Sequence, residues 1–237
     1  MISPFKDKTT LITGTTRGVG RQLAEHILRS GGDVIGFSRG NSTVAHDNYR
    51  HFSLDLADAA SITATFGEMR KHISKIDIVI NNAGVLTSQY AMIMPPAAAQ
   101  AMVNVNLLAP FLISREAAKF MRKTKWGRII NVGSMAASLE PIGDSVYAAT
   151  KVGLSTLANV MAKEFGSFNV TCNTVGISAI DSDMLAQLPR DKIEEIIKHL
   201  PVARFAQIDD ILNVIDFFAS ERSAYITAQT IFLGGVN

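Results

Sequence analysis

The stretch that decides the fold reads TTLITGTTRGVG and covers residues 9–20 of the 237-residue chain. Its first half is a short run rich in β-branched residues, and its second half spaces three glycines as G-x-x-x-G-x-G. Such a strand, turn and helix start suits a dinucleotide pyrophosphate, because glycine allows close backbone approach and the helix presents free N–H groups. The same glycines also fit a tight turn that binds nothing.

Short apolar runs alternate with longer stretches of helical periodicity along the rest of the chain, which is typical of repeated βαβ units in an α/β fold. We expect strands at Thr9–Ile12, Asp33–Phe37, Tyr49–Ser53, Ile76–Ile80, Arg128–Val132, Val170–Val175 and Thr230–Leu233. We expect helices at Gly18–Ser30, Ala60–Lys71, Ala97–Met121, Ser145–Phe165, Arg190–His199 and Asp209–Ser220. The strands at 76–80 and 128–132 are almost entirely apolar, which favours a parallel sheet buried on both faces. No linker, repeat or low-complexity tract divides the chain, so the pattern predicts one domain over residues 1–237.

Composition narrows the class of protein. A net charge of +2 gives no reason to expect nucleic-acid binding. The first residues lack a signal-peptide pattern, and no apolar run reaches the roughly 18 residues of a membrane span. Cys172 is the only cysteine, and the five histidines show no metal-ligand spacing. We expect a soluble, cytoplasmic protein without a metal site and without a membrane partner.

The end of the expected second strand indicates which cofactor the chain prefers. NAD-binding proteins usually place an acidic residue there to hold the ribose hydroxyls, whereas arginine accommodates a 2′-phosphate. Residues 36–40 contain no Asp or Glu, and Arg17, Ser38 and Arg39 together favour NADP(H). Each arginine also fits an ordinary solvated surface charge.

Further candidate cofactor contacts follow the third and fourth expected strands. Asp55 is placed to accept a hydrogen bond from the adenine amino group, and the small residues after Asn81 allow close backbone approach. Taken alone, these segments read as a helix-capping Asp and an ordinary turn. The expected cofactor contacts from the first half of the chain are Gly14, Thr15, Arg17, Gly18, Val19, Gly20, Ser38, Arg39, Asp55, Leu56, Asn82, Ala83 and Gly84.

Tyr147 and Lys151 stand four residues apart, which is one helical turn. A phenol has a pKa of about 10, and a neighbouring ammonium group favours the phenolate, which predicts a proton-delivery pair. Ser134 follows an expected strand, where a hydrogen-bond donor can meet negative charge that develops on a substrate oxygen. Without that pair, Ser134 would read as a turn serine.

These motifs, taken in order, resemble the short-chain dehydrogenase/reductase family over essentially the whole chain. Within it, the length, Arg17 and the ending at 226–230 look most like 3-oxoacyl-acyl-carrier-protein reductases. The motifs that carry the resemblance are Thr13–Gly20, Asn81–Gly84, Asn106, Ser134, Tyr147, Lys151 and Tyr225–Thr230. The resemblance implies a Rossmann fold with a seven-stranded parallel sheet in the order 3-2-1-4-5-6-7 and helices on both faces.

The resemblance also implies roles for the matching residues. Tyr147 is expected to be the general acid toward a substrate carbonyl, and Ser134 to hydrogen-bond the same oxygen. Lys151 is expected to hold the nicotinamide ribose and lower the Tyr147 pKa, so both Tyr147 and Lys151 also count as cofactor contacts. Asn106 is expected to hold a water in a proton relay, although it also fits a polar residue that satisfies helix backbone. Hydride would come from C4 of the nicotinamide.

The chain departs from the family pattern after the sixth expected strand. Ile177 and Ser178 stand where the family usually has Pro-Gly, which changes the shape of the loop beside the nicotinamide and suggests a specialised pathway. Ile180 and Ser182 remain expected cofactor contacts. The apolar excursion at about 177–205 is expected to cover the active site as a substrate lid, or to pack its helix on the core.

The leading interpretation is an NADPH-dependent reductase of 3-oxoacyl thioesters, in fatty-acid or specialised polyketide-type biosynthesis. An alternative is a short-chain alcohol dehydrogenase or ketoreductase for a sugar, steroid or small carbonyl. A non-catalytic dinucleotide-binding regulator is a third reading, against which the intact Ser134, Tyr147 and Lys151 argue. Tyr90, Met92, Met94 and Leu139 are expected to line a partly apolar pocket.

The expected partner is an acyl carrier protein or a CoA thioester. A basic cluster around Trp126, made of Arg122, Lys123, Lys125 and Arg128, either docks an acidic carrier at the pocket mouth or solvates a helix end. The helices at 97–121 and 145–165 carry more apolar residues than one buried face requires. In the family such helices form a dimer contact, so we expect a homotetramer, with a dimer as the fallback.

Overall fold

The computed structural model describes residues 3–180, 185 and 190–236, and for residues 190–192 the backbone alone. Within these residues, seven parallel strands form one sheet in the order β3-β2-β1-β4-β5-β6-β7, which confirms the expected Rossmann topology. The strands are β1 (Thr9–Thr13), β2 (Asp33–Ser38), β3 (Tyr49–Ser53), β4 (Ile78–Asn81), β5 (Gly127–Ser134), β6 (Val170–Ile177) and β7 (Thr230–Phe232). The order reverses between β1 and β4, where open parallel sheets form a ligand crevice.

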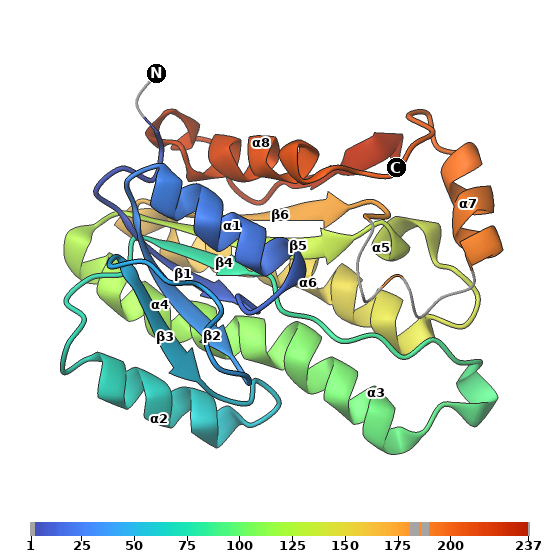
Figure 1. Ribbon diagram of the computed structural model, residues 1–237, viewed down its shortest axis with the longest axis horizontal. Helices are drawn as coiled ribbons and strands as arrows, with labels where there is room; N and C mark the ends of the chain where they lie inside the picture. Colours follow the sequence, from blue (N-terminus) through green and yellow to red (C-terminus); the bar gives the residue numbers. More distant parts are fainter. Residues whose placement is uncertain (1–2, 181–184, 186–189, 237) are drawn as a thin grey trace.

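Helices cover both faces of this sheet (Figure 1). One face carries α1 (Gly18–Arg29) and α8 (Ile208–Ala219), and the other carries α2 (Ala59–Met69), α4 (Ala109–Thr124) and α6 (Ser145–Phe165). The remaining helical segments are α3 (Pro96–Val103), the π-helix η2 (Asn104–Leu108), α5 (Ala136–Leu139), α7 (Arg190–Lys198) and the 3-10 turns η1 (Ala91–Ile93), η3 (Gly166–Phe168), η5 (Glu221–Ser223) and η6 (Leu233–Gly235).

Two apolar clusters fill the space between the sheet and its helices. On the α2–α4–α6 face, the rings of Phe37 and Phe66 meet edge to face with centroids 5.7 Å apart. On the α1–α8 face, Ile12 and Phe218 belong to the second cluster, and both are fully buried. Because both faces are covered, β4 and β5 are buried along almost their whole length, as the apolar character of their sequence indicated.

The helix expected over residues 97–121 is interrupted. The chain forms α3, then the π-helix η2, then α4. A π-turn adds one residue to a helix and is frequent at functional sites. Here the wide turn contains Asn106, which is fully buried.

The stretch Pro96–Thr124 is long and apolar enough to cross a membrane by length and composition, with a mean hydropathy of 1.4 in its most apolar window. This corrects the expectation that no segment reaches that length. In this fold, α4 turns Leu112, Ile113 and Ala117 into the core against the sheet. Its apolar character is that of a core helix, although only 33% of that window is buried in the single chain.

Candidate active site

The loops after β1 and β4 are held together by three hydrogen bonds at the sheet's switch point. The Thr13 hydroxyl accepts from the backbone N–H groups of Asn82 and Ala83, at 3.0 and 2.8 Å. The Asn82 side-chain amide donates to the Thr13 carbonyl at 2.9 Å. The Gly-rich loop and the Asn82–Gly84 segment therefore lie side by side, as expected for two parts of one cofactor site.

The Gly-rich loop has the shape of a cradle for a dinucleotide. Gly14 and Gly18 adopt φ values of +77° and +58°, in the left-handed region that favours glycine. A Cβ on Gly20 would lie 2.2 Å from the Gly14 carbonyl oxygen, so the turn can close only with glycine there. A Cβ on Gly18 would meet nothing within 4 Å, because that side of the loop is open. The residues present therefore fit a pyrophosphate above the start of α1, with Val19 half-buried in that helix's first turn.

The residues expected at the adenosine end of the cofactor differ in exposure: two arginines are exposed and a serine is buried. Arg17 and Arg39 are exposed, and residues 36–40 contain no Asp or Glu. The Ser38 hydroxyl, in contrast, is buried: it accepts from the Thr15 backbone N–H at 2.9 Å and donates to the Phe37 carbonyl at 2.8 Å. This hydroxyl joins the end of β2 to the Gly-rich loop, and the expected cofactor contact of Ser38 stays a prediction.

The residues after β3 make contacts within the protein that stabilise the turn before α2 and the core. Asp55 is exposed, and its Oδ1 accepts from the Ala57 backbone N–H at 3.0 Å, which closes a turn before α2. Asp58, not Asp55, caps that helix through the Ala60 N–H. Leu56 is buried in the core. The adenine contact of Asp55 stays a prediction.

Ser134, Tyr147 and Lys151 come together at the carboxyl edge of the sheet. Ser134 is the last residue of β5, and its Oγ accepts from the Ala136 N–H at 3.1 Å. Tyr147 and Lys151 lie in the first two turns of α6, and both are buried. The Lys151 Nζ lies 5.8 Å from the centroid of the Tyr147 ring and donates to the Val132 carbonyl at 2.9 Å.

The electrostatics of this trio correct the simple expectation of a lowered Tyr147 pKa. Burial raises the pKa of Tyr147, and the negative charge of Asp144 raises it further, while interaction with the Ser134 hydroxyl acts in the opposite direction. Burial lowers the pKa of Lys151 to about 8. In the protein alone, desolvation of the phenol is the largest effect on the Tyr147 pKa, and Lys151 does not offset it.

Asn106 reaches the site by holding the loop after β4. Its Oδ1 accepts from the Val85 N–H at 2.8 Å, and its Nδ2 donates to the Val85 carbonyl at 2.9 Å and to the Thr150 hydroxyl at 3.3 Å. The amide therefore ties the wide turn η2 to this loop and to α6. The expectation that Asn106 holds a water stays a prediction, and the contacts shown by its side chain are structural.

The loop after β6 shows what the Ile177-Ser178 pair does. Ile177 extends β6 beyond the expected end at Val175 and pairs in register with Ser134. The Met135 N–H donates to the Ile177 carbonyl at 2.8 Å, and the Ser178 hydroxyl contacts the Met135 sulfur at 3.7 Å. Ile180 forms a β-bridge with Ala206. Ser182, an expected cofactor contact, lies outside the described residues.

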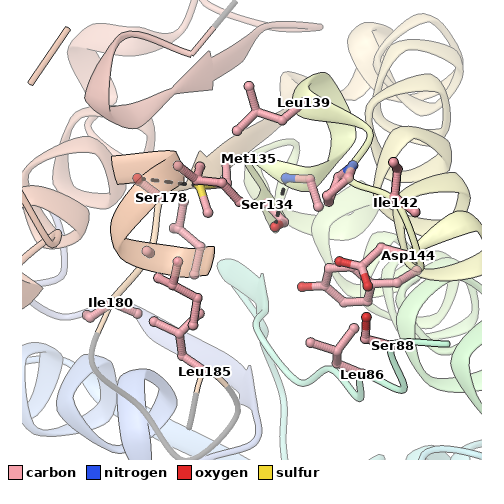
Figure 2. A pocket seen from close by; sticks show the side chains of 17 residues that line it. Leu86, Ser88, Ser134, Met135, Leu139, Ile142, Asp144, Ser178, Ile180 and Leu185 are labelled. Carbon is pink, nitrogen blue, oxygen red and sulfur yellow. Dashed lines mark hydrogen bonds between the residues drawn. The ribbon is translucent and has the colours of Figure 1, made fainter. Parts of the chain in front are cut away.

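A cavity of about 190 Å³ opens beside Ser134 and Tyr147. Figure 2 shows Leu139, Ile142, Ile180 and Leu185 around it, with Ser134 and Asp144 on its walls. Ile193 and Ile196 of α7 also line it, so the described part of the 177–205 excursion covers the site. Met184 and Leu188 of that excursion lie outside the described residues. The polar side chains among the described lining residues are Ser88, Ser134, Asp144, Tyr147 and Ser178.

The lining differs in part from the sequence-based expectation. Leu139 lines the cavity, but Tyr90 and Met92 are exposed. Met94 does not line the cavity and packs against the cluster of Met102, Ala136 and Tyr147. Asp144 and Ser88 were missed. The position of Asp144, three residues before Tyr147, was the available signal.

The basic cluster around Trp126 does not lie at the pocket mouth. Arg128 is fully buried and packs over the Trp126 ring at 4.4 Å, while Lys123 and Lys125 are exposed beside the amino end of β5. Ser134 ends the same eight-residue strand, about 23 Å away at the usual rise of a strand. In the single chain the cluster and the cavity therefore lie at opposite ends of β5, and docking of a carrier stays a prediction.

Comparison with known proteins identifies the class. The model of the short chain dehydrogenase family matches residues 8–193. The chain is 32% identical to the 3-oxoacyl-acyl-carrier-protein reductases of Pseudomonas aeruginosa and Escherichia coli, over 98% of this chain and 97% of each relative. Its structure is similar to a gluconate 5-dehydrogenase from Burkholderia cenocepacia in complex with NADP and tartrate, with a TM-score of 0.92, 26% identity and coverage of 99% and 96%. The chain belongs to the short-chain dehydrogenase family, whose members are oxidoreductases that use an NAD(P) dinucleotide.

Substitution of Gly20 tests the cradle. We expect Gly20→Ala to weaken binding of NADPH or NADH, whichever the wild type binds more tightly, at least tenfold, because the new Cβ would overlap the Gly14 carbonyl and the neighbouring backbone would have to move. Titration of NADPH or NADH fluorescence measures the dissociation constant. Gly67→Ala is the matched control, since Gly67 lies on the exposed side of α2 with nothing within 4 Å of its added Cβ. Unchanged binding of NADPH and of NADH by Gly20→Ala would contradict this assignment.

The lowered pKa of Lys151 predicts a pH dependence of stability. Below about pH 8 the buried ammonium is charged and destabilises the fold; as pH rises toward the ordinary value of 10.5, the folded state loses this proton before the unfolded state does. Without cofactor, the free energy of unfolding of the wild type should therefore rise relative to that of Lys151→Met, by on the order of 2 kcal/mol between pH 7 and pH 10. Urea unfolding of both proteins at each pH measures the difference, and a constant difference would show that Lys151 titrates as an exposed lysine.

Proposed function

We propose that this protein reduces a 3-oxoacyl thioester, carried by an acyl carrier protein or CoA, to the 3-hydroxyacyl thioester with NADPH. The observation that carries the proposal is the apolar cavity that opens directly onto Ser134 and Tyr147. An acyl chain suits such walls, and a reacting carbonyl placed between these two hydroxyls meets two hydrogen-bond donors. The full-length similarity to 3-oxoacyl-acyl-carrier-protein reductases supports the same substrate class.

The chemistry follows from the protein's own groups once a dinucleotide supplies hydride from the nicotinamide C4. Reduction turns the carbonyl oxygen into an alkoxide. Ser134 and Tyr147 would hydrogen-bond this oxygen while its negative charge grows, and Tyr147 would then transfer its proton. Because burial raises the pKa of Tyr147, the phenol is protonated at neutral pH and ready to act as the acid.

Lys151 and Asn106 support this arrangement. Lys151 is fixed by the Val132 carbonyl at the end of β5, and from there we propose that its remaining protons reach the nicotinamide ribose. If the contact with the nicotinamide ribose brings the charged Lys151 closer to the phenol, Lys151 would lower the Tyr147 pKa during turnover. Asn106 holds the loop after β4 and the Thr150 hydroxyl one residue from Lys151.

We propose NADP(H) as the preferred cofactor. Arg17 and Arg39 are exposed on the two loops that border the adenosine end, and residues 36–40 offer no carboxylate to a ribose hydroxyl. Guanidinium groups pair well with phosphate, and a carboxylate there would repel it. The bound NADP of the gluconate 5-dehydrogenase, which is 26% identical, supports this choice.

A second candidate function is the oxidation or reduction of a small polyhydroxylated carbonyl compound. The polar wall made by Ser88 and Asp144 favours it, because these groups can hydrogen-bond substrate hydroxyls. The structural similarity to a gluconate 5-dehydrogenase agrees with this reading. The larger apolar share of the cavity makes it the weaker candidate.

We also propose a homotetramer, with a dimer as the fallback, formed through α4 and α6. These helices leave Phe111, Val152 and Val160 partly exposed, at 37%, 43% and 48%. Together with Leu108 in the turn before α4, they form an apolar surface that a second copy would cover.

Activity assays test the proposed reaction. Wild type should oxidise NADPH with acetoacetyl thioesters more efficiently than it reduces or oxidises sugars and sugar acids. Tyr147→Phe should lower kcat by 10²–10⁴-fold, because the acid is lost, while NADPH affinity measured by fluorescence stays within about threefold. Preferred turnover of a sugar would select the second candidate, and tight NADPH binding without turnover of any carbonyl would indicate a regulator.

Light scattering during size-exclusion chromatography tests the assembly. The double variant Phe111→Glu, Val152→Glu should elute with half the wild-type mass, because burying two carboxylates in an apolar contact costs several kcal/mol. A tetramer should separate into dimers held by its second interface, and a dimer into monomers. Met92→Glu is the control, since Met92 is also apolar and 99% exposed but lies outside these helices. A variant that keeps the wild-type mass would place the contact elsewhere.

A further inference from the structure

Asp144 is a buried carboxyl group that the reaction described above does not use. It lies immediately before α6, three residues from Tyr147, and only 7% of its surface is exposed. Its side chain lines the cavity, and Figure 2 shows it on the same wall as Ser88. The Oδ1 atom has no hydrogen-bond partner among the residues that the structure describes.

The usual local role of such a residue does not account for this carboxyl group. An aspartate at a helix N-cap normally accepts from a backbone N–H of the first turn. The Asp144 side chain makes no such bond, and α6 instead uses the Asp144 main-chain carbonyl, which accepts from the Ala148 N–H at 2.7 Å. Buried acceptors in proteins normally have a hydrogen-bond partner, so the unpartnered Oδ1 marks this carboxyl group as a candidate for contact with a bound molecule.

The surroundings of Asp144 determine what such a ligand must offer. Among the described lining residues there is no lysine, arginine or histidine to pair with the carboxylate. The start of the 21-residue helix α6 favours a negative charge at this position. A bound molecule therefore meets a carboxylate acceptor in a mainly apolar cavity, close enough to Tyr147 that the charge affects the phenol.

We infer that Asp144 determines substrate specificity by accepting a hydrogen bond from an N–H or O–H group of the substrate, and that it disfavours substrates with a negative charge near the carbonyl. This inference rests on the proposed function, because it assumes that a carbonyl compound occupies the cavity. Asp144 would favour a neutral substrate that carries one hydrogen-bond donor and is otherwise hydrocarbon in the part that fills the cavity. An amide N–H in the arm of a thioester and a hydroxyl group both meet this requirement.

Four acetoacetyl compounds test the inference without changing the reacting carbonyl. The N-acetylcysteamine thioester carries an amide N–H, the 2-hydroxyethyl thioester carries a hydroxyl, the ethyl thioester carries no donor, and free acetoacetate is an anion. Wild type should reduce at least one donor-bearing thioester with a kcat/KM at least tenfold above that of the ethyl thioester, and acetoacetate should be the poorest substrate. The better of the two donor compounds identifies the source of the hydrogen bond.

Two variants assign that preference to Asp144. Asp144→Ala should bring the donor-bearing and ethyl thioesters within about twofold of each other, mainly through a higher KM for the donor compound. Asp144→Asn keeps an acceptor oxygen but no charge, so it should retain part of the donor preference and improve the relative kcat/KM for acetoacetate. A structural role alone would change all four substrates in parallel.

Glu140→Gln is the matched control, because Glu140 is exposed near the site but does not line the cavity. It should leave the substrate ratios unchanged, and NADPH affinity should be the same in every variant. Equal kcat/KM for donor-bearing and ethyl thioesters in wild type, or unchanged ratios in Asp144→Ala, would overturn the inference while the proposed function stands. If Asp144→Ala does not fold, the wild-type ratios and Asp144→Asn decide. Failure of wild type to reduce any of the four compounds would overturn the proposed function itself.

Discussion

The whole site depends on how the ends of β1 and β4 are joined. One hydroxyl, that of Thr13, accepts from two consecutive backbone N–H groups of the neighbouring loop, and the Asn82 amide returns a bond to the Thr13 carbonyl. The close approach of Gly20 to Gly14 and Asn82 leaves no room for a side chain at this junction. The two halves of the sheet are therefore tied together here, and the Gly-rich loop and the Asn82–Gly84 segment are positioned by the same bonds.

Burial, more than local charge, sets the chemistry of the reacting groups. A phenol and an ammonium group one turn apart would each be expected to favour the charged form of the other. In the folded chain both lose water: burial raises the pKa of Tyr147 and lowers that of Lys151 to about 8, so at pH 7 the phenol is protonated and the ammonium is still charged. This state suits a proton donor at rest. It also means that an approaching charge, whether from substrate or cofactor, acts in a medium that screens it poorly.

The strands and most of the longer helices could be predicted from the sequence, because apolar periodicity and glycine turns are local signals. The strand order came from the resemblance to the family, and the single helix expected over residues 97–121 is in fact α3, η2 and α4. Ser134, Tyr147 and Lys151 could be found for the same reason: their spacing places them at strand and helix ends. The contacts made by several individual side chains could not be predicted from the sequence. The buried hydroxyl of Ser38, the burial of Arg128 and the inward orientation of Asp144 depend on partners distant in sequence, and the π-helix at 104–108 continues the apolar pattern of the helices on either side of it.

That π-helix constrains the length of the chain. A single residue advances an α-helix by about 100°. The additional residue in η2 lets Asn106 face Val85 while Leu112 and Ile113, further along, still face the sheet. Deleting one residue between 104 and 108 would restore a regular helix, but it would rotate α4 relative to α3 and turn one of these two sets away from its partners. The alignment of relatives should therefore lack gaps in this segment, since insertions and deletions are tolerated only where no such angular phase has to be kept.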